Sequence, residues 1–265
     1  MLRCFKCNIG PLYFEDDFDD FDKVGIANYG AKNGTDTPLL MSIFARNDSV
    51  TQSTSFWLRV EFSNDIHMLA GAPEAAWIGL TVPWGQDDRG GATLRMTVQL
   101  VNKTTTRLPE AIFLRFSPKE KGKIGNSATQ GLADEHSPGC SWTMQKLGSS
   151  LDPTRVVTGG GKWMHVVDAV TFNCSYSSSW NSPLYAPAGA SSSHGLRINT
   201  YDSGLVRWGP LSALPVPTTE GPGKGEDGAF ILFNNLWGTN YIMWYPFETK
   251  ERDIKYEYDV YLWSS

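Results

Sequence analysis

The sequence predicts a mainly β protein: an antiparallel β-sandwich of two packed sheets, with a short N-terminal helical segment. Several segments alternate apolar and polar residues with a period of two, the pattern of strands that bury one face. The 265 residues include 26 Gly and 15 Pro, which favour many turns over long helices. Hydrophobic residues make up 41% of the chain and charged residues 19%, a composition that excludes a disordered protein.

We predict one sandwich domain over residues 51–265, preceded by a segment at residues 1–50 that holds a short helix and a connection. A chain of this length can bury a sizeable core, and all-β chains of this size often form a single unit. In residues 13–23, three Phe recur at helical spacing with acidic residues between them, which indicates a short amphipathic helix. Those acids lack the loop pattern and central Gly of a calcium site, so we interpret them as a solvated face. Residues 30–38 then form a polar loop.

The strands of the sandwich are predicted to follow that loop. Residues 56–62, 94–101 and 254–262 alternate most clearly, so each should bury one face. Residues 77–82 are apolar on both faces until Pro83, which predicts a centrally buried strand. Further strands are predicted at residues 111–116, 142–147, 162–172, 195–201 and 205–208, the last two flanking the turn signal Asp202-Ser203-Gly204.

One stretch near the C-terminus gathers aromatic and amide side chains around a tight turn. Apolar residues 230–233 lead into Asn234-Asn235-Leu236-Trp237-Gly238-Thr239-Asn240, which is typical of a strand that ends in a turn bonded by side chains. A buried turn beneath aromatic packing would use these residues, because Asn side chains satisfy unpaired backbone groups. A corner that faces a sugar would use them too, because aromatic faces stack on sugar rings and amides bind hydroxyls. In that second interpretation the contact candidates are Asn234, Asn235, Trp237, Asn240 and Trp244.

The sequence contains no motif for catalysis or metal binding. The four His are scattered singly, and no His-x-Asp pair, His-Glu-x-x-His or Gly-x-Ser-x-Gly occurs. His165 and Asp168 fall three apart in a predicted strand, where their side chains point to opposite faces unless a bulge intervenes. Cys4 and Cys7 have the spacing of a zinc knuckle but lack a second Cys or His pair. We therefore predict no metal, no cofactor and no catalytic residue in this chain.

The remaining cysteines leave the cellular compartment open. Cys140 and Cys174 could be free thiols or one disulfide, depending on a compartment that the sequence does not state. Four Asn-x-Ser/Thr sequons are compatible with secretion but also arise by chance in a chain rich in Ser and Thr. They begin at Asn33, Asn47, Asn102 and Asn173.

The charge and hydropathy of the chain exclude two kinds of partner. The 23 basic and 28 acidic residues give a net charge of −5 with no basic stripe, so a nucleic-acid partner is not expected. No apolar run is long enough to span a bilayer, and the N-terminus lacks the apolar core of a signal peptide. We therefore expect neither a transmembrane segment nor a signal peptide in this chain.

Four stretches along the chain resemble the motifs of one known family and occur in the same order as in that family. They are Arg107-Leu108-Pro109-Glu110-Ala111, Trp142-Thr143-Met144-Gln145-Lys146-Leu147-Gly148, Leu151-Asp152-Pro153 with His165-Val166-Val167-Asp168, and Phe233-Asn234-Asn235-Leu236-Trp237-Gly238-Thr239-Asn240-Tyr241-Ile242-Met243-Trp244-Tyr245. Together they resemble a family of glycosidase-like proteins of unknown function that is related to family 38 of the glycoside hydrolases, the α-mannosidases. The resemblance covers roughly residues 50–262.

This resemblance implies a supersandwich-like region that follows a catalytic domain in a larger protein. The α-mannosidase relatives use a zinc ion held by His and Asp, together with an aspartate nucleophile, in that upstream domain. Zinc is therefore expected in the upstream domain and not in this chain. Residues 1–50 would be a remnant of the connection from that domain, and Met1 either a late start or the start of a truncated gene model.

Three hypotheses of function follow. The resemblance favours a C-terminal, non-catalytic sandwich that acts with an upstream catalytic domain on carbohydrate. Composition permits a stand-alone carbohydrate-binding module with aromatic surfaces such as Trp237, Trp244 and Trp208. The third hypothesis is an enzyme with an unfamiliar carboxylate arrangement, in which Glu110 is the most suggestive group. For Glu110 we favour an ion pair with Arg that holds the end of its strand, Arg107 being the Arg of the same stretch.

Overall fold

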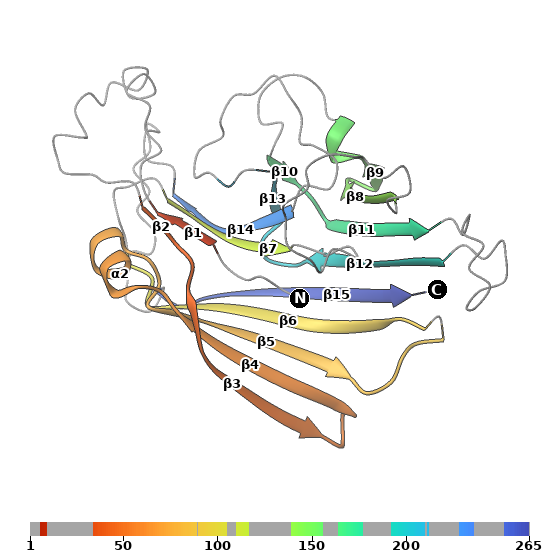
Figure 1. Cartoon of the computed structure of the whole chain (residues 1–265), viewed down its shortest axis with the longest axis horizontal. Coiled ribbons are helices and arrows are strands. Elements are labelled where there is room, and N and C mark those ends of the chain that lie inside the picture. The colour runs from red at the N-terminus through yellow and green to blue at the C-terminus, as the bar shows by residue number, and fades with distance from the viewer. Residues whose placement is uncertain are drawn as a thin grey trace, which may run out of the picture.

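Two antiparallel sheets pack face to face around a shared core, which confirms the predicted class (Figure 1). The computed structural model describes residues 6–9, 34–88, 90–104, 110–116, 139–155, 164–176, 192–209, 211, 228–235 and 252–264. The helix predicted at residues 13–23 lies outside these residues. The described helices are α2 (Asn64–Ala70) and the 3-10 helix Pro153–Arg155. No helix of the described residues is both long and apolar enough to cross a membrane.

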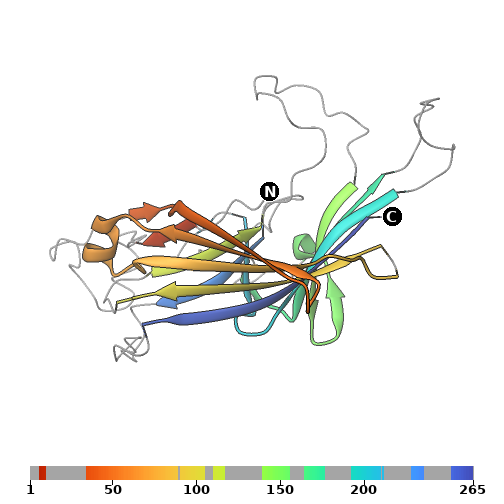
Figure 2. The same ribbon diagram turned by 90° about the horizontal axis from the view of Figure 1, so that it is seen from below.

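The larger sheet has nine strands and the smaller one six. In spatial order the nine are β3 (Leu39–Asp48), β4 (Ser53–Glu61), β5 (Ala75–Pro83), β6 (Ala92–Val101), β15 (Ile254–Ser264), β12 (Ser192–Thr200), β11 (Ala169–Tyr176), β8 (Gly139–Lys146) and β9 (Ser149–Leu151). The six are β10 (Met164–Val166), β13 (Leu205–Trp208), β14 (Gly228–Asn235), β7 (Glu110–Phe116), β1 (Lys6–Ile9) and β2 (Gly34–Asp36). The larger sheet twists strongly, so that β8, β11 and β12 run at an angle to β3, β4 and β5 (Figure 2).

The predicted period-two strands each present one face to the core. Along β15, Tyr256, Tyr258 and Val260 are buried and alternate with more exposed residues, as the sequence predicts. The Tyr258 ring meets the Phe230 ring of β14 at a centroid distance of 5.2 Å, so the contact joins the two sheets. The Tyr256 hydroxyl donates a hydrogen bond to the carbonyl of Leu232 on β14. Burial raises the pKa of Tyr258, so its phenol stays protonated inside the core.

β5 is an internal strand of the larger sheet, between β4 and β6, as its unbroken apolar sequence predicts. Both of its faces carry buried residues, Ala76 on the core face and Ala75 on the other. Ile78 is buried in the core, whereas Trp77 on the opposite face is half-buried and contacts the Phe44 ring of β3 at a centroid distance of 6.0 Å.

The described strands begin before residue 51, where the predicted domain starts. β1 and β2 belong to the smaller sheet, and β3 forms one edge of the larger sheet. β3 pairs with β4 across a turn in which the Asp48 carboxylate accepts hydrogen bonds from the N–H groups of Val50 and Thr51. The predicted boundary between residues 50 and 51 therefore falls inside a β-hairpin. The periodicity does not reveal β3 because its first apolar residues are consecutive and its register shifts between Leu40 and Ser42.

A corner joins the two sheets where the sequence predicts one strand at residues 162–172. This prediction is corrected: the segment contains β10 of the smaller sheet and β11 of the larger one. The returning chain makes the same change from β12 to β13, so the turn signal at residues 202–204 marks a crossing between sheets. The Val167 N–H donates to the Gly204 carbonyl at 2.8 Å, and the Ser203 hydroxyl donates to the Ile231 carbonyl at 2.5 Å. These bonds hold the two crossings together and tie them to β14.

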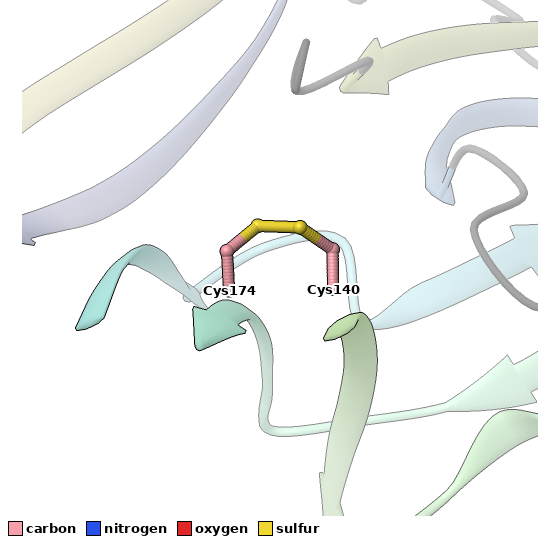
Figure 3. The surroundings of a disulfide bond; sticks show 2 residues. All are labelled: Cys140 and Cys174. Carbon is pink, nitrogen blue, oxygen red and sulfur yellow. A yellow bond between two sulfur atoms is a disulfide. The ribbon is translucent and has the colours of Figure 1, made fainter. Parts of the chain in front are cut away.

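Cys140 and Cys174 form a disulfide between the neighbouring strands β8 and β11 (Figure 3). They are register partners in this strand pair, and Cys174 is fully buried. Of the two alternatives that the sequence leaves open, the structure shows the disulfide. Bonds of this kind form and persist in oxidising environments.

Replacing both cysteines, as Cys140→Ser with Cys174→Ala, should lower the free energy of unfolding by about 2–4 kcal/mol. The bond joins residues 34 positions apart, so it restricts the unfolded chain over a long loop. Urea unfolding of the oxidised protein, the reduced protein and the double variant measures the effect. A peptide map without reductant that lacks the linked Cys140 and Cys174 peptides would contradict the assignment.

Candidate functional site

Asn234 and Asn235 occupy the last two positions of β14, at one end of the smaller sheet. Their register partners on β7 are Ala111 and Glu110. A β-bulge just before Asn234 shifts the register and re-aims the strand end. Asn234 is half-buried, and its Oδ1 is buried without a hydrogen bond within the described part of the chain. An amide oxygen in this state can accept a hydrogen bond from a ligand or from another segment.

A buried ion pair lies beside this strand end. The Lys103 ammonium donates to Glu110 Oε1 at 2.7 Å and to the Thr104 carbonyl at 2.6 Å. It also lies 4.5 Å from the centroid of the Phe233 ring, a cation–π contact. The Lys103 and Glu110 side chains are both 0% exposed, so water does not screen the pair.

The turn that follows β6 places Lys103 in the core. Asn102 has a φ of 54°, in the left-handed region that Asn adopts more readily than most residues. The Asn102 N–H donates to the Asp253 carboxylate at 3.0 Å, and the Lys103 N–H donates to the Arg252 carbonyl at 3.0 Å. These bonds fix the chain against the segment that enters β15. The Lys103 side chain consequently reaches the Phe233 ring.

The geometry favours a structural role for Glu110. Glycosidases use carboxylates that reach the scissile bond, whereas the Glu110 carboxylate is fully buried and paired. The structure shows an ion pair at the start of the strand, in which Lys103 is a basic partner of Glu110. Arg107 lies outside the described residues. The sequence gives no signal for Lys103, because it lies seven residues before Glu110 in a polar segment and meets it through the fold.

The other carbohydrate-contact candidates divide into two groups. Trp237, Asn240 and Trp244 lie outside the described residues. Trp208, named as a surface of a binding module, is 1% exposed and packs against Trp142 at a centroid distance of 5.3 Å. A buried indole cannot stack on a sugar in this structure, so that interpretation of Trp208 is corrected.

The family-like stretches contact one another in pairs where the structure describes them. The first and the last meet in the pairing of β7 with β14, at Glu110 and Asn235. In the other pair the Leu147 N–H donates to Asp168 Oδ2 at 3.2 Å, and the Asp168 N–H donates to the Gln145 carbonyl at 2.8 Å. These residues of the motifs therefore join strands of the sandwich.

His165 and Asp168 belong to different parts of the corner. His165 lies in β10 and pairs with β13 in the smaller sheet, whereas Asp168 follows β10 and holds the turn after β8. Within the described ranges, no group of three or more His, Cys, Asp or Glu side chains is placed to hold a metal ion.

No protein-family model matches the sequence, and no curated protein matches it either.

Proposed function

We propose that this chain is the C-terminal, non-catalytic β-sandwich portion of a glycoside-hydrolase-like protein that acts on carbohydrate. One observation carries the proposal: the four family-like stretches contact one another in two pairs within the sandwich. Residues that hold a fold together should recur as a set among proteins that share the fold. Such residues need no catalytic groups. The proposal therefore assigns the zinc ion and the nucleophile to an upstream domain.

In this proposal the strand end at Asn234 and Asn235 completes or supports the active site of that domain. The half-buried amide of Asn234 offers an acceptor oxygen there, and the aromatic residues of the following stretch would add stacking surface. The Lys103–Glu110 pair fixes the start of β7, the strand that pairs with this end of β14. Its role is to hold the strand end in place.

The isolated chain should not hydrolyse aryl α-mannosides or other aryl glycosides, with or without added zinc. The physical reason is that two reachable carboxylates or a metal site are needed, and Glu110 is buried in an ion pair. Release of nitrophenol from nitrophenyl glycosides measures this, with heat-treated protein as the blank.

A Glu110→Gln variant serves as the matched control in the same assay. Turnover that depends on zinc, or that disappears in the Glu110→Gln protein, would contradict the proposal and favour an enzyme with an unfamiliar carboxylate arrangement.

A further inference from the structure

Two aromatic side chains form a flat surface on the outer face of the larger sheet. Tyr261 and Trp263 lie on β15, at positions that alternate with the core residues Tyr258 and Val260. Their rings stack with a centroid distance of 5.8 Å and an interplanar angle of 23°. Both residues are half-buried. We call the pair the aromatic platform.

Glycines on both sides of β15 allow the platform to lie flat. A Cβ at Gly91, just before β6, would overlap the Tyr261 ring, and a Cβ at Gly195 of β12 would overlap the Trp263 ring. Each ring therefore lies close to the backbone of a neighbouring strand.

Polar groups of both charges surround the platform. On β12, Arg197 is the register partner of Tyr261 and donates from Nε to Asn199 Oδ1 at 3.0 Å. On β15, Asp259 precedes the platform on the same face and accepts a hydrogen bond from the Tyr201 hydroxyl at 2.5 Å. The surface thus offers a guanidinium, an amide and a carboxylate beside two ring faces.

Two neighbouring charges complete this surface. The Glu257 carboxylate of β15 pairs with the Arg95 guanidinium of β6 at 2.9 Å. Hydrogen bonds from Lys255 and then from Arg95 lower the pKa of the Glu257 carboxyl, so it is ionised at neutral pH. The basic side chains are thus offset by acidic ones along the same strand.

We propose that the aromatic platform binds a neutral oligosaccharide of pyranose rings. A sugar ring has an apolar C–H face, which stacks on an aromatic ring, and a rim of hydroxyls that both donate and accept hydrogen bonds. Ring faces flanked by Arg197, Asn199 and Asp259 match both features. A nucleic acid would also stack, but the basic side chains beside the rings are offset by acidic ones, so the surface has no basic patch for a polyanion.

This site stands apart from the proposed function. The platform lies on β15 of the larger sheet, whereas Asn234 and Asn235 end β14 of the smaller one. Failure of one assignment therefore leaves the other intact.

Trp263→Leu should lower affinity for a neutral oligosaccharide at least about tenfold, since an aromatic contact contributes on this scale. The probes are gluco-, manno- and chito-oligosaccharides, measured by titration calorimetry. All proteins in this experiment carry Asn173→Gln. The exposed Asn173 starts a sequon and is the register partner of Gly195, so a glycan attached to it could reach the platform. The matched control is Trp84→Leu, which removes an indole that is 54% exposed elsewhere and should leave affinity unchanged.

A second variant, Gly91→Ala, keeps both aromatic side chains. The added Cβ displaces the flexible end of Tyr261, so affinity should fall while the melting temperature changes little. This variant decides the matter if Trp263→Leu fails to fold. The proposal is overturned if the parent protein binds none of the three probes, if it binds only polyanions, or if Gly91→Ala binds like the parent.

Discussion

Replacing Lys103 with methionine is expected to lower the free energy of unfolding by about 3–5 kcal/mol, because the change removes a buried cation that is paired with the buried Glu110 carboxylate. Both side chains are 0% exposed, and the ammonium also serves the Thr104 carbonyl and the Phe233 ring. Domains are typically stable by about 5–15 kcal/mol, so the loss would be a large share of the total. Urea unfolding of Lys103→Met measures it.

Two further variants separate the buried pair from a general effect of losing a lysine. The double variant Lys103→Met/Glu110→Leu removes both charges and should recover most of the lost stability, since an apolar pair of similar volume often replaces a buried ion pair well. Lys255→Met removes an exposed lysine that pairs with Glu257 and should leave stability nearly unchanged. A Lys103→Met protein as stable as the parent would show that the pair does not hold this strand end.

Trp208→Ala is expected to cost about 3–5 kcal/mol, the usual range for emptying the volume of an indole from a core. The Trp208 ring packs between Trp142 of β8 and the backbone of Gly228, so it joins the two sheets. The exposed Trp84, whose indole donates to Thr54 at 2.8 Å, is the matched control, and Trp84→Ala should change stability by less than about 0.5 kcal/mol.

Thermal unfolding of the two Trp variants gives the comparison, and glycan binding is measured on the same proteins. A Trp208→Ala protein that melts like the parent but no longer binds glycan would restore Trp208 as a sugar-contact surface.

The sequence predicts the class of fold because a strand with one buried face has an apolar residue at every second position. β15 shows this directly, with Tyr256, Tyr258 and Val260 inside. The same pattern does not report which sheet a strand belongs to. The alternation therefore passes through Val167 and Asp168 without a sign that the chain crosses from one sheet to the other. The sequence does not predict β3, because both faces of this edge strand are largely exposed. Such a strand does not require apolar and polar residues to alternate.

The candidate site was predictable in part. The resemblance singled out Glu110 together with the Asn234 stretch, and the register of β7 with β14 brings Glu110 and Asn235 together. Lys103, which pairs with Glu110, has no local signature in the sequence. The turn at Asn102 and the hydrogen bond from the Lys103 N–H to the Arg252 carbonyl place it beside Glu110. Trp208 could not be placed either, because an aromatic residue in a short strand has the same sequence pattern inside or outside the core.

The transcript upstream of Met1 tests whether this sandwich is the non-catalytic C-terminal portion of a glycosidase-like protein, as we propose. Full-length sequencing of the transcript is the measurement. We expect an open frame that continues upstream into a domain carrying clustered His and Asp zinc ligands. A stop codon in frame shortly before Met1, in a transcript that begins there, would contradict the claim and favour the stand-alone carbohydrate-binding module.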